Sequence, residues 1–76
     1  MNKTTLTYQG QKPELYEAVE TLIAPLEGFI EDMDFFKGQT ILFIRFKSEA
    51  ALDSFKEELQ SSPLKYQVEI GSEISV

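Results

Sequence analysis

Two aspartates, Asp32 and Asp34, are the residues whose types and spacing could do chemistry in this sequence. They stand two positions apart in an extended segment, so their carboxylates project from the same face of a strand. Apolar neighbours such as Ile41 and Phe43 would raise the pKa of an adjacent carboxyl group and let it act as a general base. A cationic neighbour such as Arg45 would instead pair with it, and this structural role is the one we favour.

The residue types that the chain lacks limit the chemistry further. Its 76 residues contain no histidine and no cysteine, so no imidazole base, thiolate nucleophile or soft-metal site is available. A hard cation such as Ca²⁺ needs several convergent oxygens, but Glu31 is expected on the face opposite Asp32 and Asp34. We therefore expect no metal and no cofactor, and we favour a protein that is not an enzyme.

The composition is that of one small folded domain with an acidic surface. Apolar residues make up 42% of the chain and aromatic residues 12%. The formal net charge of −6 argues against binding to a nucleic-acid backbone or to an anionic membrane. No apolar run approaches the roughly 18 residues of a membrane helix, and the first residues lack an apolar signal region, so we expect a cytoplasmic protein. A domain this small, without disulfides or zinc, is commonly reinforced by dimerisation.

Hydrophobic periodicity predicts six elements in the order strand, helix, strand, strand, helix, strand. The strands are expected at residues 4–10, 28–36, 39–46 and 64–70, and the helices at 13–24 and 48–60. Pro13 begins the first helix and Ser48 caps the second. Two right-handed βαβ halves predict an α+β, ferredoxin-like βαββαβ plait. Its four-stranded antiparallel sheet has the order 4-1-3-2 and both helices on one face. Residues 1–76 form a single domain, in which 71–76 are left open between an extra strand and a terminal tail.

A two-residue turn at Lys37 and Gly38 sets the register of the central hairpin. It predicts three cross-strand pairs, Phe36 with Gln39, Met33 with Leu42 and Phe29 with Phe46. The face expected beneath the helices then carries Phe29, Glu31, Met33, Phe35, Leu42, Ile44 and Phe46. The face that no helix covers keeps an apolar cluster, and such clusters mark an interface or a ligand groove. We therefore expect a binding surface made of Ile30, Asp32, Asp34, Phe36, Ile41, Phe43 and Arg45.

Part of the hairpin is similar to an RNA-recognition motif, because Lys37 and Gly38 are followed by Phe43-Ile44-Arg45-Phe46. That family stacks bases on aromatic rings of the uncovered face. The corresponding positions here are Thr7, Gln39 and Ile41, which carry no ring. Together with the acidic charge, this excludes nucleic acid from the expected partners.

The same region resembles the dimeric α+β barrels of the antibiotic-biosynthesis-monooxygenase type. The resemblance covers roughly residues 13–63 and rests on Ala24-Pro25-Leu26-Glu27-Gly28-Phe29 and on Phe46-Lys47-Ser48-Glu49-Ala50-Ala51-Leu52. It implies homodimers that pack sheet against sheet, with the C-terminal segment crossing to the partner. Phe46 stands where the family has tryptophan and the chain has no histidine, so the resemblance does not by itself imply the enzymatic activity.

The sequence thus favours a small acidic, non-enzymatic domain that acts through its uncovered sheet face, as a homodimer. Its expected partners are a protein or a small apolar ligand. Two alternatives stay open. One is a cofactor-independent, monooxygenase-like enzyme with an apolar cavity between two sheets. The other is an acidic inhibitor that mimics nucleic acid and blocks a basic groove of another protein.

Overall fold

The computed structural model describes residues 2–71, and its elements follow the predicted order. The strands and α-helices are β1 (Lys3–Gln9), α1 (Pro13–Ile23), β2 (Phe29–Phe36), β3 (Gln39–Arg45), α2 (Glu49–Gln60) and β4 (Glu69–Ile70). A 3₁₀ helix follows each α-helix, η1 (Ala24–Leu26) and η2 (Pro63–Tyr66). The strands form one antiparallel sheet in the order β2-β3-β1-β4, which is the predicted order counted from the other edge. The predicted α+β class with a four-stranded antiparallel sheet and two helices is therefore confirmed.

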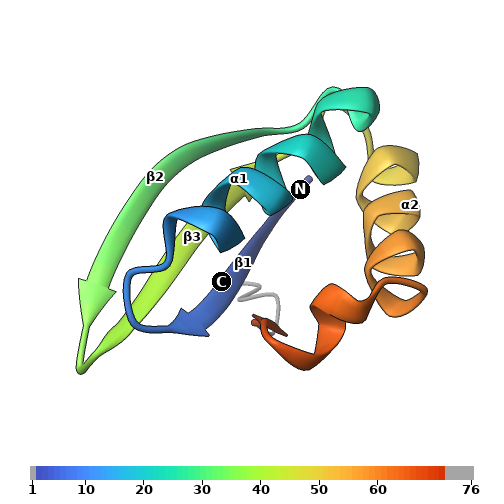
Figure 1. Cartoon of the computed structure of the whole chain (residues 1–76). Helices are drawn as coiled ribbons and strands as arrows, with labels where there is room; N and C mark the ends of the chain where they lie inside the picture. Colours follow the sequence, from blue (N-terminus) through green and yellow to red (C-terminus); the bar gives the residue numbers. More distant parts are fainter. Residues whose placement is uncertain (1, 72–76) are drawn as a thin grey trace.

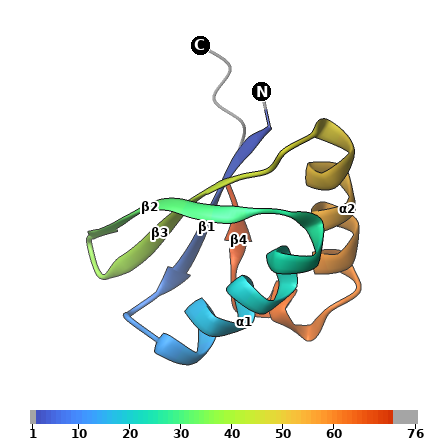
Figure 2. The ribbon, with the colours of Figure 1, turned by 90° about the horizontal axis from the view of Figure 1, so that it is seen from above.

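Local signals explain where the two helices begin. Pro13 occupies the first helical turn of α1, where its missing N–H costs no hydrogen bond. The Ser48 hydroxyl accepts a hydrogen bond from the backbone N–H of Ala51 at 3.1 Å and caps α2 as predicted. Both helices lie on the same side of the sheet (Figures 1 and 2).

One hydrophobic core fills the space between the helices and the two central strands. Phe46 and Phe55 are at its centre, with their ring centroids 5.2 Å apart. The remaining core residues come from every layer of the fold: Leu6, Tyr8, Leu15, Val19, Ile23, Leu42, Ile44, Leu52, Leu59 and Val68. The helices therefore bury the inner faces of β1 and β3.

The C-terminal strand is shorter than predicted. Residues 64–70 alternate, but Pro63–Tyr66 is a 3₁₀ helix and only Glu69–Ile70 pairs with β1. The Ser62 hydroxyl accepts from the N–H of Leu64 at 3.1 Å, and this cap together with Pro63 starts a helical turn instead of a strand. In an alternating strand over residues 64–70, Tyr66 would face inward with Leu64 and Val68, but in the 3₁₀ helix it is 82% exposed. The segment 71–76, which was left open between an extra strand and a terminal tail, lies outside the described residues except for Gly71.

The half of the outer strand β2 next to the hairpin turn is not covered by the helices, although its inner face was expected beneath them. Met33 and Phe35 share a sheet face with the buried Leu42 and Thr40, yet they remain 56% and 48% exposed. The hairpin end of β2 and β3 projects beyond the helix layer (Figures 1 and 2). An edge strand can extend in this way because only one of its sides has to pair.

Candidate functional site

The β2–β3 turn has the predicted register. Lys37 and Gly38 both have positive φ, at 55° and 77°, as a two-residue hairpin turn that matches the strand twist requires. Phe36 consequently faces Gln39 and Met33 faces Leu42, so both predicted pairs are confirmed.

Further from the turn, a β-bulge changes the register. The pairing shifts between Ile30 and Asp32, and Glu31 is the extra residue. Beyond it, Ile30 pairs with Ile44, and Phe29 pairs with Arg45 instead of Phe46. The predicted Phe29–Phe46 pair is therefore wrong.

The bulge exchanges the faces of two apolar side chains. Ile30, expected on the uncovered face, lies on the helix side beside the buried Ile44 and packs against the core. Phe29, expected beneath the helices, lies on the uncovered face and is 51% exposed. A strand without the bulge would have buried Phe29 and exposed Ile30, because side chains alternate with a period of two.

Glu31 also moves to the uncovered face, where it finds two cations. Its carboxylate lies 3.0 Å from Arg45 Nε and 3.3 Å from Lys3 Nζ, and these two residues oppose each other across β1 and β3. All three side chains are partly exposed, so each pair stabilises the fold by less than about 1 kcal/mol. Glu31, which was expected beneath the helices, is thus neutralised on the uncovered face.

Six of the seven residues predicted for the binding surface do share the uncovered sheet face, and Phe29 takes the place of Ile30. We call this surface the open face, and its residues are Phe29, Asp32, Asp34, Phe36, Ile41, Phe43 and Arg45. Ile41 and Phe43 lie on the central strand β3 and are partly buried by their neighbours, whereas Phe36 at the turn is 60% exposed. Figure 2 shows no helix on this side of the sheet.

Asp32 and Asp34 bind the backbone next to them, and Arg45 pairs with Glu31 instead. Their Oδ1 atoms accept hydrogen bonds from the N–H groups of Met33 and Phe35, at 2.8 and 2.9 Å. Along a hairpin, hydrogen-bonded and non-hydrogen-bonded pairs alternate, and the pair beside the turn is hydrogen-bonded. Met33 and Phe35 belong to non-hydrogen-bonded pairs, so their amides point away from β3, toward the free edge of β2. The two carboxylates therefore cap the edge of the sheet.

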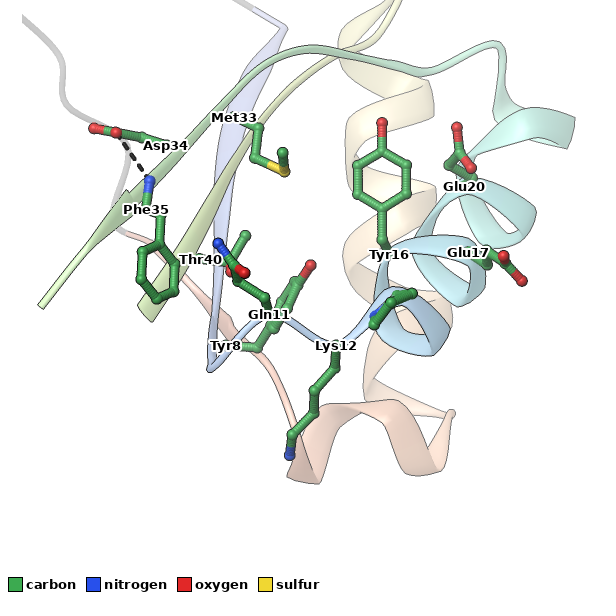
Figure 3. Close-up of a pocket in the computed structure, with 11 residues that line it drawn as sticks. Tyr8, Gln11, Lys12, Tyr16, Glu17, Glu20, Met33, Asp34, Phe35 and Thr40 are labelled. Carbon is green, nitrogen blue, oxygen red and sulfur yellow. Dashed lines mark hydrogen bonds between the residues drawn. The ribbon is translucent and has the colours of Figure 1, made fainter. Parts of the chain in front are cut away.

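A second surface, which the sequence did not predict, lies on the helix side of the hairpin. It is an open groove of about 650 Å³ between α1 and the hairpin, and we call it the α1–hairpin groove (Figure 3). It is lined by Tyr8, Gln11, Lys12, Pro13, Tyr16, Glu17, Glu20, Met33, Asp34, Phe35 and Thr40. The groove exists because β2 extends past the helices, which no pattern within β2 itself indicates.

The floor of the groove is held in place by buried polar groups. The Thr40 hydroxyl donates to the carbonyl oxygen of Gly10 at 2.6 Å and ties β3 to the segment before α1. Burial raises the pKa of Tyr8 above its ordinary value, and a hydrogen bond with Thr40 opposes part of this shift. Tyr8 and Thr40 thus place two polar groups at the base of a groove whose two walls are apolar.

Within residues 2–71, the acidic side chains do not gather into a set that could hold a metal ion, and no helix has the length and apolar character to cross a membrane. No protein-family model, curated protein or solved structure was found to match the chain. The open face and the α1–hairpin groove therefore carry the functional argument on their own.

Proposed function

We propose that this chain is a ferredoxin-like, non-enzymatic interaction domain that forms a homodimer through its open face. The observation that carries the proposal is the apolar stripe on the side of the sheet without helices. Ile41 and Phe43 form its centre, and the more exposed Phe36 and Phe29 lie toward its two ends. Covering such side chains is favourable by roughly 25 cal/mol for each Å² of apolar surface removed from water.

The charges around the stripe suit burial against a second sheet. Glu31 is already paired with Arg45 and Lys3, so covering it isolates no charge. Asp32 and Asp34 accept hydrogen bonds only from neutral backbone N–H groups, so their carboxylates need either water at the β2 edge or a cation of the second copy. In a two-fold dimer with its axis near Phe43, Arg45 of one copy would approach Ile41 and the neighbouring Asp34 of the other. The same contact would then occur twice, as two-fold symmetry requires.

The two alternative functions have less support. A monooxygenase-like enzyme needs a carboxylate directed into an apolar cavity, whereas Asp32 and Asp34 are exposed and bonded to adjacent amides. A nucleic-acid mimic needs carboxylates aligned along one surface. In this fold the acidic side chains are divided among the β2 edge, α1 and α2, with Asp32 and Asp34, Glu17 and Glu20, and Glu57 and Glu58.

The test is the substitution Phe43→Glu, with Phe35→Glu as its matched control. Both variants place a carboxylate in the hairpin, but Phe43 belongs to the open face and Phe35 to the helix side. We expect a dimer for the unmodified chain and for Phe35→Glu. For Phe43→Glu we expect a dissociation constant at least about 100-fold higher, because a buried, unpaired charge costs several kcal/mol.

Sedimentation equilibrium over a range of protein concentrations measures this constant, and far-ultraviolet circular dichroism checks that the helices persist. A monomer at every concentration, or equal dissociation of both variants, would overturn the proposal.

A further inference from the structure

The α1–hairpin groove has apolar walls on two different elements. Met33 and Phe35 form one wall on β2, and Tyr16 and Pro13 form the other on α1 and at its start. In Figure 3 the Met33 side chain and the Tyr16 ring stand on opposite sides of the open space, above Tyr8 and Thr40. A volume of about 650 Å³ lies within the usual range of ligand sites, roughly 300–1,000 Å³. The groove can therefore enclose an inserted apolar side chain on two sides, whereas a flat sheet face can contact it on one side only.

The edges of the groove are acidic. Its lining includes the three carboxylates of Glu17, Glu20 and Asp34 and a single cation, Lys12, whose ammonium group points away from the open space (Figure 3). In the same view the Asp34 and Glu17 carboxylates also point away from the open space and Glu20 lies beyond the Tyr16 ring, so the charged groups are at the rim and not across the floor. The ion pairs found between residues 2 and 71 do not include Glu17 or Glu20. This edge therefore attracts cations without obstructing the apolar floor.

The β2 edge beside the groove offers acceptors more readily than donors. The N–H groups of Met33 and Phe35, which point outward, are already bonded to Asp32 and Asp34. The carbonyl oxygens of the same two residues point to the same edge, because both groups of a residue face the same way in an antiparallel ladder. A partner rich in hydrogen-bond donors is therefore preferred at this position.

From these three features we infer that the α1–hairpin groove binds a basic peptide segment of a partner protein. The segment inserts an apolar side chain between Tyr16 and Met33 and places lysine or arginine beside Glu17, Glu20 and Asp34. Basic side chains supply both the charge and the donors that this edge lacks, and such complementarity gives specificity and fast association. The floor and the apolar walls of the groove lie on the opposite side of the sheet from the open face, and Asp34 at the β2 edge is the residue that the two surfaces share. The inference rests on the floor, the walls and the two α1 carboxylates, so it does not depend on the proposed dimer.

The probe for this inference is a fluorescein-labelled heptapeptide that alternates arginine with leucine. Two companion peptides separate charge from apolar contact, one alternating glutamate with leucine and one alternating arginine with serine. We expect the arginine–leucine peptide to raise fluorescence anisotropy in a saturable way and the other two to bind at least about tenfold more weakly. In ¹H–¹⁵N correlation spectra, its addition is expected to shift the resonances of Tyr16, Met33 and Phe35.

A matched pair of charge reversals locates the site. Glu17→Lys combined with Glu20→Lys alters the edge of the groove, whereas Glu57→Lys combined with Glu58→Lys makes the same change of net charge on exposed positions of α2. We expect the first double variant to weaken the arginine–leucine peptide about tenfold and the second to change its affinity less than about twofold.

Four results would overturn the inference. The first is no saturable binding of the arginine–leucine peptide, and the second is equal binding of the arginine–serine peptide. The third is an equal loss of affinity in the two double variants, which would indicate only a general attraction to an acidic protein. The fourth is a shift of the groove resonances with protein concentration alone, which would place a second copy in the groove. Repeating the titration with Phe43→Glu separates this test from the proposed dimer, since that substitution is on the other face.

Discussion

The β2–β3 hairpin leaves apolar side chains uncovered on both of its faces, but the two faces differ in shape and in charge. On the open face, Ile41 and Phe43 lie on a sheet surface beside the Glu31–Arg45 ion pair. On the helix side, Met33 and Phe35 form one wall of a groove with an acidic edge. The Glu31–Arg45 pair on the open face suits the proposed contact with a second sheet, whereas the acidic edge of the groove suits the proposed cationic segment.

Residue type alone does not determine which kind of surface an exposed apolar side chain forms. Met33 and Phe35 are no less apolar than Ile41 and Phe43. They differ in what stands opposite, because α1 faces the first pair and no element of the described chain faces the second pair. The neighbouring layer therefore determines whether a patch is flat or concave.

The largest expected effect is a difference in the free energy of unfolding between variants of the buried strand β3 and of the uncovered strand β2, tested at one cross-strand pair. Leu42 and Met33 oppose each other on the same face, but Leu42 is fully buried and Met33 is largely exposed. We expect Leu42→Ala to lower the free energy of unfolding by about 2–5 kcal/mol, because it leaves a cavity in the core. Met33→Ala is expected to lower it by less than about 1 kcal/mol.

Urea unfolding followed by circular dichroism measures both values. Equal losses in the two variants would mean that the groove closes over Met33 in solution, and the distinction between the buried strand β3 and the uncovered strand β2 would disappear.

A second, smaller effect concerns the β2 edge, which both surfaces share. Replacing Asp32 and Asp34 by alanine removes the acceptors of two outward-pointing N–H groups and exposes an edge that can pair with another chain. We expect this double variant to self-associate, beyond any dimer, at protein concentrations where the unmodified chain does not. Asp32→Asn with Asp34→Asn keeps a side-chain oxygen at each position and is expected to resist association, although it loses the same two charges.

Light scattering at matched concentrations compares the two double variants. If the asparagine variant associates as strongly as the alanine variant, charge repulsion protects the edge and the side-chain caps do not.

Much of the fold could be predicted because its signals are local. Pro13 and Ser48 mark the helix starts, and the hairpin turn is indicated by Gly38 between two apolar strands. These residues act through their own backbone geometry or through a hydrogen bond to a near neighbour. Their structural effect can therefore be predicted without knowledge of the rest of the fold.

The parts that could not be predicted depend on distant residues. Glu31 interrupts an apolar row, which was the one available signal of the bulge, but only Lys3 and Arg45 make the outward position favourable. The groove depends on how far α1 reaches across the sheet, and the alternation of Met33 and Phe35 within β2 does not contain that information. The sequence consequently predicted the sheet face of six of the seven residues correctly, was wrong about the face of Ile30, and did not indicate the groove. The role of the open face as a binding surface stays a prediction.

The smallest expected effect is a change of stability at high pH that reports how far water is excluded from the floor of the groove. Burial disfavours the tyrosinate form of Tyr8, so its pKa in the folded protein lies above its ordinary value of about 10. A group whose pKa is raised by folding stabilises the fold fully below its unfolded pKa, and this contribution is lost as the pH rises through the folded pKa. We therefore expect the free energy of unfolding to fall above about pH 10, and Tyr8→Phe to remove part of that fall.

Tyr66→Phe is the matched control, because Tyr66 is 82% exposed. Tyrosinate absorbance during alkaline titration is expected to lose its latest step in Tyr8→Phe and to keep that step in Tyr66→Phe. Loss of the same step in both variants would show that water reaches Tyr8 freely, and the groove would then be no drier than the open face.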